Sequence, residues 1–319
     1  MVYLRLEMVV ILQILGDLVI RLGFFYAFIA LGFLVTRIGS IKAKLNKVVT
    51  FALINFMMPL LIIDTLLTAN PTSILEVLGI LLFTVFIHLF GFTLMYIRLR
   101  KTDIQKKEKG AYLLTVTFNN GIFLPLPIAL MFIGEIAVPV IAIYSISQMI
   151  MLATLGTFMG SAYSENQDDR KAMLKKALTF PPLIAVVIAL ILLLSGVAIP
   201  SFIEPILDGN SFVTTYLALF AVGLSLGAQD IIKKSRYVYE TIAIRQFVVP
   251  ITVGLLLIFA GLTQLVSSVI LLQAMMPAAV FTVIYSSALE LDSESAATIV
   301  TLGTLVLLPI VPFMPLLFG

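Results

Sequence analysis

The chain has 319 residues, of which 61% are hydrophobic and 12% are charged, and its mean hydropathy is +1.15. A soluble domain carries about 25% charged and about 45–50% apolar residues, so this composition excludes an ordinary soluble domain. The apolar excess is spread along the whole chain in runs of about 20 residues, the length that spans a bilayer. The sequence therefore predicts an all-α polytopic membrane protein.

The formal net charge of +3 is small, and the chain has no cysteine. The lack of cysteine excludes disulfides, thiolate metal sites and thiol nucleophiles. The first 22 residues carry Glu7, Asp17 and Arg21 and lack an A-x-A-like site, so we expect no cleavable signal peptide. Asp17 and Arg21 lie four residues apart, the spacing of a helical ion pair.

Ten apolar runs predict ten transmembrane helices, numbered here as spans one to ten. Their expected positions are residues 15–36, 46–68, 74–97, 111–133, 137–160, 178–197, 211–229, 240–261, 264–288 and 294–317.

Lys and Arg residues orient these spans, because short cytoplasmic loops carry an excess of both. The first, third, fifth and seventh connections hold four, six, four and three of the 20 basic residues, and the second, fourth, sixth and eighth hold none. We therefore expect a multi-pass protein of the cell membrane with both termini outside. The ninth connection is acidic, but acidic residues contribute little to orientation. The basic loops are expected to meet lipid headgroups, not nucleic acid.

The longest polar connection, residues 163–176, divides the chain into two sets of five spans. The first set comprises residues 1–162 and the second residues 177–319. An odd number of spans in each set places the two sets in opposite orientation. Such 5+5 inverted repeats are typical of secondary transporters, which hold substrate near the bilayer midplane between discontinuous helices.

Residues that interrupt helices stand at matching places in the two halves. Pro59 lies in span two, and we expect Gly223 and Gly227 to interrupt the equivalent span seven. Span four contains FNNGIFLPLP (residues 118–127), and span nine contains QAMMPAAV (residues 273–280). Each set of interruptions lies near the middle of its span.

Prolines in the middle of spans four and nine predict broken helices, because proline removes a helix hydrogen bond and clashes with the preceding turn. Broken backbone at membrane depth is tolerated only inside protein or beside a water-filled cavity. We therefore expect the two breaks to meet and to form a polar substrate site. The alternative is a pair of ordinary kinks with no binding role. The candidate site residues are Asn119, Asn120, Gly121, Pro127, Gln148, Gln273, Pro277 and Ala278.

Several polar residues within the spans allow two interpretations each. Asn119 and Asn120 are expected to line the site or to join helices. Gln148 reaches the site if spans four and five are neighbours. Asp64 and His88 are candidates for binding a coupling ion, although Asp64 is also placed to be solvated at the outer mouth, and a buried neutral histidine commonly bonds to nearby backbone.

Two further observations concern charge and chemistry. Glu240 and Arg245 are expected to be structural, at the cytoplasmic start of span eight. Residues 223–227 match the G-x-S-x-G pattern of hydrolases, but they lie in a membrane span far along the chain from the lone histidine. The sequence contains no Walker sequence or H-E-x-x-H motif. We expect a protein that is not an enzyme and needs no cofactor beyond a possible coupling Na⁺ or H⁺.

The chain resembles the auxin efflux carrier family across almost all ten spans. The resemblance rests on NKVVTFALINFMMPLL in span two, LALFAVGLSLG in span seven, and the interrupted stretches of spans four and nine. Asn120 falls on the family asparagine and Pro127 on the family proline. The chain departs from the family at Pro125, where many members have glycine. It departs again at Phe180 and Phe281, where polar residues are usual.

This resemblance implies crossing, broken helices four and nine, with Pro127 and Pro277 near the crossing point. It also implies a scaffold of spans one, two, six and seven, a mobile transport domain of spans three to five and eight to ten, and a homodimer. The implied activity is elevator-type transport of a small organic anion such as a carboxylate. A similar architecture serves bile-acid sodium symporters and some sodium/proton antiporters, so a sodium- or proton-coupled carrier is the main alternative. A receptor or channel is another.

The middle of spans four, five, nine and ten contains no Lys or Arg. We therefore expect half-helix N-termini, assisted by the amides of Asn119 and Asn120, to supply the positive potential for an anion.

Overall fold

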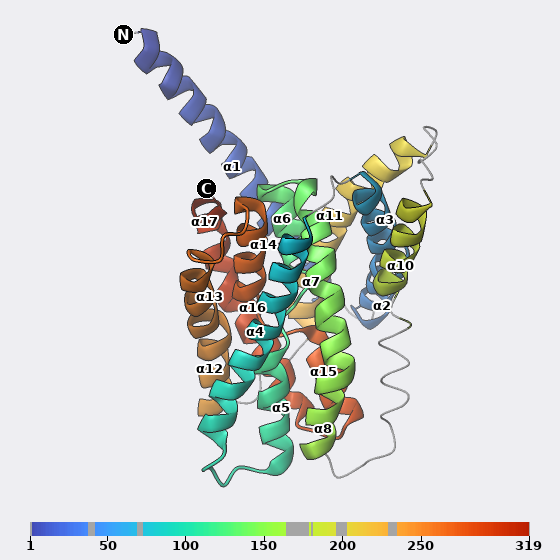
Figure 1. Cartoon of the computed structure of the whole chain (residues 1–319), viewed down its shortest axis with the longest axis vertical. Helices are drawn as coiled ribbons and strands as arrows, with labels where there is room; N and C mark the ends of the chain where they lie inside the picture. The colour runs from blue at the N-terminus through green and yellow to red at the C-terminus, as the bar shows by residue number, and fades with distance from the viewer. Residues whose placement is uncertain are drawn as a thin grey trace.

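The computed structural model describes residues 2–37, 42–68, 73–163, 179, 181–195, 203–228 and 235–318. Within these residues the chain is helical, and the β-type pairing is one isolated bridge between Asn119 and Ala278. The expected linker at residues 163–176 lies outside the described residues except for Tyr163, and Phe180 lies outside them too. Figure 1 shows helices standing side by side, with the start of α1 projecting beyond the rest.

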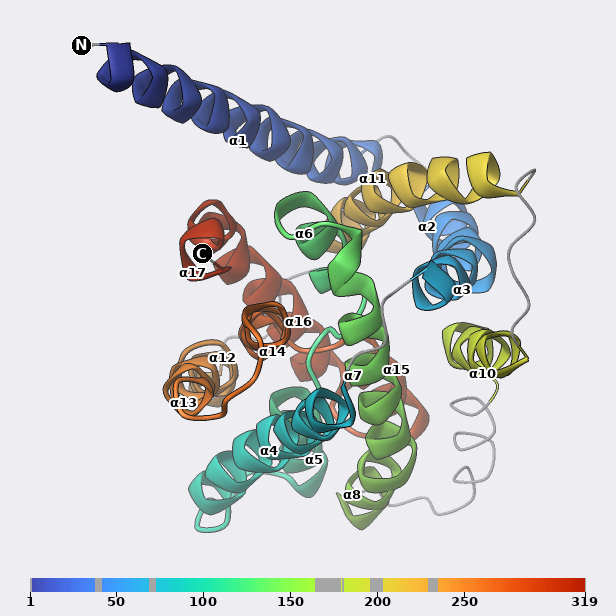
Figure 2. The ribbon, with the colours of Figure 1, turned by 45° about the horizontal axis from the view of Figure 1, so that its top comes forward.

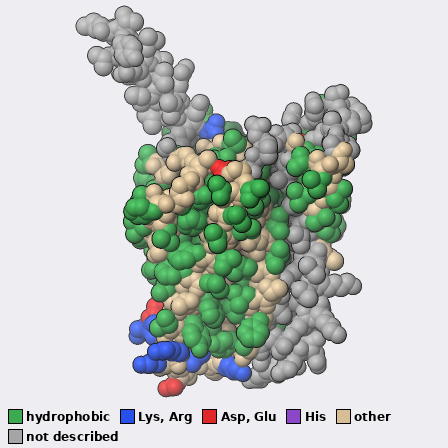
Figure 3. Space-filling view, in the orientation of Figure 1, with side chains coloured by type: hydrophobic (Ala, Val, Ile, Leu, Met, Phe, Trp, Pro, Cys, Tyr) green, Lys and Arg blue, Asp and Glu red, His purple; other side chains and the backbone are tan. Residues whose placement is uncertain are grey.

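Five helical stretches in the described part are long and apolar enough to cross a membrane. They coincide with the predicted spans three, five, seven, eight and ten. Apolar side chains cover much of the face seen in Figure 3, as expected of a surface that meets lipid. The five stretches are Ile74–Leu99, Glu135–Gly156, Pro205–Leu224, Arg236–Leu257 and Ser293–Phe313.

One group of helices lies to one side of the molecule (Figure 2). The long helix α1 packs along α11, and α10 packs against α3. The bounds in this group are α1 (Val2–Val35), α2 (Lys42–Ala52), the π-helical turn η2 (Leu53–Met57), α3 (Met58–Thr68), α10 (Pro181–Leu194) and α11 (Glu204–Ala228).

Glycines allow α1 and α11 to approach closely. A Cβ atom on Gly223 would lie 2.0 Å from the carbonyl oxygen of Ile29, and one on Gly32 would lie 2.1 Å from that of Phe220. Helix α11 runs without interruption through both Gly223 and Gly227. The prediction that these glycines interrupt span seven is therefore wrong. At Gly223 the absence of a side chain lets α1 and α11 pack closely. Helix α11 has no proline at this position, so its hydrogen bonds continue.

Proline explains the interruption of span two. Its ring clashes with the carbonyl four residues earlier and it has no N–H to donate. In the structure the π-helical turn η2 ends two residues before Pro59, so the predicted interruption is confirmed. The π-helical turn η5 (Ile244–Val248) precedes Pro250 in the same way.

The second group of helices surrounds the broken spans. Helix α4 (Ile74–Leu99) begins with a capping box in which Ser73 and Glu76 bond reciprocally. The other elements in the first half are α5 (Lys106–Thr117), α6 (Pro125–Phe132), the 3₁₀ turn η3 (Glu135–Ala137), α7 (Val138–Met151), the π-helical turn η4 (Leu152–Gly156) and α8 (Thr157–Tyr163). Those in the second half are α12 (Arg236–Ala243), α13 (Val249–Leu257), α14 (Gln264–Met275), α15 (Val280–Ala288), α16 (Ser293–Leu307), the 3₁₀ helix η6 (Leu308–Phe313) and α17 (Pro315–Phe318).

Basic side chains gather at the end of the molecule opposite the two termini (Figures 1 and 3). Glu240 on α12 forms ion pairs there with Arg98 (2.8 Å) and Arg236 (2.6 Å). These contacts fit the structural role expected for Glu240. Arg21 lies elsewhere and donates a hydrogen bond to the carbonyl of Met131.

Candidate functional site

Span four is broken between α5 and α6. Helix α5 ends at Thr117, and α6 begins at Pro125, so residues 118–124 form the break. The backbone of Phe118 is already extended (φ −102°, ψ 113°). Pro125 suits the start of a helix, where a missing N–H costs nothing. The break predicted in span four is therefore present.

Span nine is broken over residues 276–279, between α14 and α15. Met276 and Ala279 are both extended, with ψ angles of 144° and 140°. Pro277 explains the conformation of Met276, because a residue before proline is driven out of the helical region. The predicted break in span nine is also present.

The two breaks meet and pair. The backbone N–H of Asn120 donates to the carbonyl of Pro277 (2.7 Å), and that of Ala279 donates to Phe118 (2.8 Å). These bonds flank the antiparallel bridge between Asn119 and Ala278. We call this contact, residues 118–120 with 277–279, the crossover. Each break thus supplies hydrogen-bond partners for backbone groups of the other, which buried polar groups require.

Asn119 ties the crossover to neighbouring helices. Its side chain is completely buried, and its Nδ2 donates to the Gln273 side chain (3.1 Å) and to the Gln273 carbonyl (3.0 Å). Its Oδ1 accepts from the hydroxyl of Tyr144 (2.9 Å). The Nε2 of Gln148 donates to the backbone carbonyl of Asn119. Asn119 therefore joins spans four, five and nine.

Gly121 brings backbone from span four against span five. Its carbonyl accepts hydrogen bonds from Ser145 (2.9 Å) and from Nε2 of Gln273 (3.0 Å). A Cβ atom at this position would lie 2.4 Å from Oε1 of Gln148. That oxygen is buried and has no hydrogen-bond partner among the described residues. The close approach explains why glycine stands here.

A narrow pocket of about 10 Å³ opens beside the crossover, which is room for about one water molecule. Asn120 lines it, and Oδ1 of Asn120 accepts a hydrogen bond from the N–H of Phe123 (3.0 Å). Phe281 also lines it, where the family resemblance leads us to expect a polar residue. The pocket lining comprises Asn119, Asn120, Gly121, Ile122, Phe123, Ser145, Gln148, Met149, Leu152, Ala279, Val280 and Phe281.

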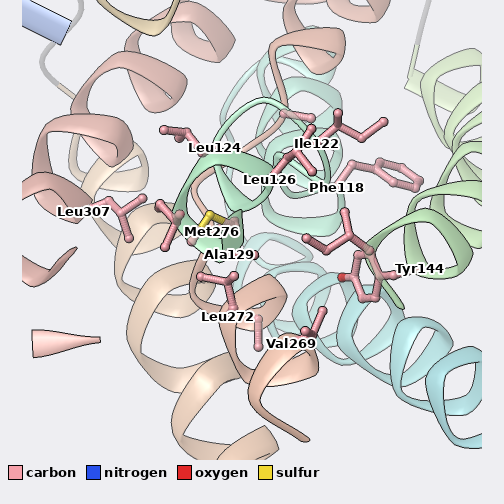
Figure 4. Close-up of a cluster of buried hydrophobic side chains, with 14 of the residues drawn as sticks. Phe118, Ile122, Leu124, Leu126, Ala129, Tyr144, Val269, Leu272, Met276 and Leu307 are labelled. Atoms are coloured by element: carbon pink, nitrogen blue, oxygen red, sulfur yellow. The ribbon is translucent and has the colours of Figure 1, made fainter. Parts of the chain in front are cut away.

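Apolar side chains enclose the crossover on its other sides. Figure 4 shows them converging from several helices, and the residues labelled there include Phe118, Leu126, Tyr144 and Leu272. Pro127 lies in the first turn of α6 and is buried. A polar contact surrounded in this way is shielded from water, which strengthens its electrostatic interactions.

The two candidate coupling residues, Asp64 and His88, are not among the residues that line the pocket. His88 on α4 is completely buried, and its Nδ1 bonds to the carbonyl of Thr84 (2.6 Å). This is the bond to nearby backbone that the sequence offered as an alternative. Asp64 lies on α3, is partly exposed, and is not among the residues that line the pocket.

Sequence reasoning missed two residues at the crossover and misplaced a third. Tyr144 and Ser145 lie four and three residues before Gln148, so all three share a helix face, and that spacing could have revealed them. Arg245 was expected at the cytoplasmic edge. The structure instead places it, fully buried, against the end of α14, where it bonds to Ala274 and Met276.

Two further features bear on ligand binding. A larger cavity of about 310 Å³ lies at the end of the molecule where α4 ends and α5 begins. Arg100, Lys106 and Lys109 contribute to its lining, together with Tyr96 and Tyr163. Among the described residues, no three His, Asp or Glu side chains lie together as a metal site requires.

Apolar helices of membrane length and two interrupted helices that meet at a buried, hydrogen-bonded contact define a multi-pass membrane transport protein. The chain belongs to the family described as membrane transport protein, the auxin efflux carrier family, whose model matches residues 17–315. It is similar to a protein of Methanocaldococcus jannaschii described as an uncharacterized transporter. The two are 28% identical over 283 residues, which cover 86% of this chain and 91% of the relative.

Proposed function

We propose that this membrane transporter is a secondary-active carrier of a small organic anion such as a carboxylate. The observation that carries the proposal is the small pocket beside the crossover, which lies between two interrupted helices and has four polar side chains in a mainly apolar lining. Helix α15 begins at this pocket, and its first turn has no side-chain cap. An uncapped helix N-terminus carries about half a positive charge and attracts anions.

The arrangement of helices supports an inverted repeat of five plus five spans. The broken pair α5–α6 in the first half has its counterpart in α14–α15 in the second. Both termini lie at the end opposite the basic side chains (Figures 1 and 3), which supports ten spans with both termini outside the cell membrane.

Elevator-type alternating access is part of the proposal. Helices α1, α2, α3, α10 and α11 pack mainly with one another and would form the scaffold of spans one, two, six and seven. The helices around the crossover would form the moving domain. The family resemblance adds a homodimer to this scheme.

The test is transport by purified protein in liposomes, with radiolabelled malonate, acetate and indole-3-acetate as probes. We expect at least one to be transported and to raise the melting temperature of the protein. Asn120→Ala should abolish this transport without lowering the melting temperature of the ligand-free protein, because the side chain loses one hydrogen bond, from the N–H of Phe123.

The matched control is Asn55→Ala, which removes an amide that bonds to Phe51 within span two, away from the pocket. This variant should transport normally. Normal transport by Asn120→Ala would reject the pocket as the substrate site.

One observation favours the second candidate, a carrier coupled to sodium or protons. The Oε1 atom of Gln148 is a buried acceptor without a partner among the described residues, and it faces the pocket region beside Gly121. Such an oxygen suits a cation or the hydroxyl of a protonated acid. Transport that depends on an imposed sodium or pH gradient would support coupling. Transport at the same rate without either gradient would exclude coupling to sodium or protons.

A further inference from the structure

Arg245 is a buried charge beside the crossover, although its place in the sequence predicts a structural role at the cytoplasmic start of span eight. Its side chain is 1% exposed. Its Nε donates to the carbonyl of Met276 (3.3 Å) and its Nη2 to that of Ala274 (3.1 Å). Its Nη1 is buried and has no hydrogen-bond partner among the described residues. A charged residue at membrane depth is a candidate for function by default.

No carboxylate balances this charge within the described part of the chain. Glu240, on the same span as Arg245, forms its ion pairs with Arg98 and Arg236 instead. Tyr144 and His88 are the ionisable groups close enough to Arg245 to interact with it electrostatically. Burying a lone charge is costly unless dipoles or an opposite charge compensate. The compensation present is the negative C-terminal end of α14.

The π-helical turn η5 explains how Arg245 reaches this position. Pro250 clashes with the carbonyl of Gln246, four residues earlier, and cannot donate a bond to it. The resulting turn inserts an extra residue into the helix. Arg245 and Gln246 are both buried, and Gln246 donates to the carbonyl of Gly303 (2.9 Å). Both side chains thus point toward spans nine and ten.

Four half-helix ends meet at the crossover with different electrostatic signs. Helices α5 and α14 present C-terminal ends, which are negative, and α6 and α15 present N-terminal ends, which are positive. Arg245 covers the negative end of α14. Helix α6 has Pro125 and Pro127 in its first turn, and neither carries an N–H to donate. The open positive end is therefore that of α15, where Ala279 and Val280 line the pocket.

We propose that Arg245 makes the pocket selective for anions, because its charge cancels the negative end of α14 and so removes one of the two negative helix ends that face the positive end of α15. The inference rests on the proposed function in treating this pocket as the place where the anion binds. Arg245 is a positioning and charge-setting residue, since it does not line the pocket itself.

The expected size of the effect on ion concentration in the pocket follows from the distance between Arg245 and the pocket. Met276, which Arg245 contacts, and Ala279, which lines the pocket, are three residues apart, so at most about 11 Å separates their Cα atoms. A unit charge at such a distance changes the local concentration of a monovalent ion by about tenfold, at an effective dielectric constant of about 20.

The chain has no cysteine, so a single introduced thiol can report the potential of the pocket. Phe123→Cys places the thiol at a partly exposed position of the lining. Its reaction rate is measured with two methanethiosulfonates of similar size, the anionic sulfonatoethyl and the cationic trimethylammonium-ethyl reagents. The ratio of the two rates reports charge, because poor access slows both. Met149→Cys, on the same lining, is the second reporter.

We expect the anionic-to-cationic rate ratio to fall by about a hundredfold in Arg245→Met, about tenfold from each reagent. Arg245→Lys keeps the charge and should hold the ratio within about threefold. Arg245→Gln is a second neutral variant if the Met variant does not fold. The control is Arg236→Met, which removes one positive charge from an exposed ion pair away from the pocket lining and should leave the ratio unchanged.

An unchanged ratio in a folded neutral variant would overturn the inference, even if that variant were less stable. A fall in Arg245→Lys equal to that in Arg245→Met would also overturn it, because geometry and not charge would then be responsible. The experiment uses no substrate, so its outcome is independent of whether any carboxylate is transported.

Discussion

The break in span four and the break in span nine reach the same contact by different means. The span-four break supplies polar side chains, since Asn119 bonds to Gln273 and Tyr144 and Asn120 lines the pocket. The span-nine break consists of Met276, Pro277, Ala278 and Ala279, whose side chains have no polar atoms. It contributes backbone carbonyls and the open start of α15.

The two halves therefore contribute to the site in different ways. Specific contacts depend on side chains in span four, which substitution can remove one at a time. The contribution of span nine lies in its backbone, which proline shapes and which Arg245 supports from span eight. Side-chain substitutions should therefore have larger effects at the span-four break than at the span-nine break.

The largest expected effect on stability is that of Asn119→Ala. It leaves the Tyr144 hydroxyl and Oε1 of Gln273 buried without the partner that Asn119 provides, at a cost of about 1–3 kcal/mol for each group. Ala278→Gly, on the other strand of the same bridge, is the matched control and should cost only about 0.5–1 kcal/mol. Thermal unfolding in detergent measures both. Equal losses would show that the two breaks do not differ as described.

A smaller loss, about 1–3 kcal/mol, is expected for Gly121→Ala, because the added methyl group collides with Oε1 of Gln148. Gln148→Ala in the same chain should restore part of the stability by removing the obstructing atom. A double-mutant cycle of melting temperatures measures this coupling. Additive losses in the double variant would mean that Gly121 and Gln148 are not in contact.

Much of this arrangement could be predicted from residue patterns. The breaks follow from Pro125, Pro127 and Pro277, because proline acts locally and its effect on a helix is the same in any fold. The contact of Gln148 with span four needed only the assumption that spans four and five are neighbours, and the structure confirms that contact.

Other features depended on tertiary packing and were beyond a pattern of residues. Arg245 stands near one end of its apolar run, which predicts a place at the membrane edge, but the π-helical turn before Pro250 redirects it inward. The sequence at Gly223 fits two uses of glycine, a bend or a close contact between helices. Only the position of α1 decides between them.

The account depends most on the pairing of residues 118–120 with 277–279. Asn119 and Ala278 form a non-hydrogen-bonded antiparallel pair, because the hydrogen bonds lie on either side of them. Such pairs have Cα atoms about 4.5 Å apart, within the range that a disulfide bridges. The natural chain has no cysteine to interfere.

The most direct measurement is therefore a cross-link between Asn119→Cys and Ala278→Cys in a chain carrying a protease site between residues 163 and 181. After mild oxidation and cleavage, the account predicts that the two halves remain joined on a non-reducing gel and separate on reduction. Asn119→Cys paired with Phe259→Cys, at a position 86% exposed, should not join them. Halves that separate without reduction in the Asn119–Ala278 pair would contradict the account.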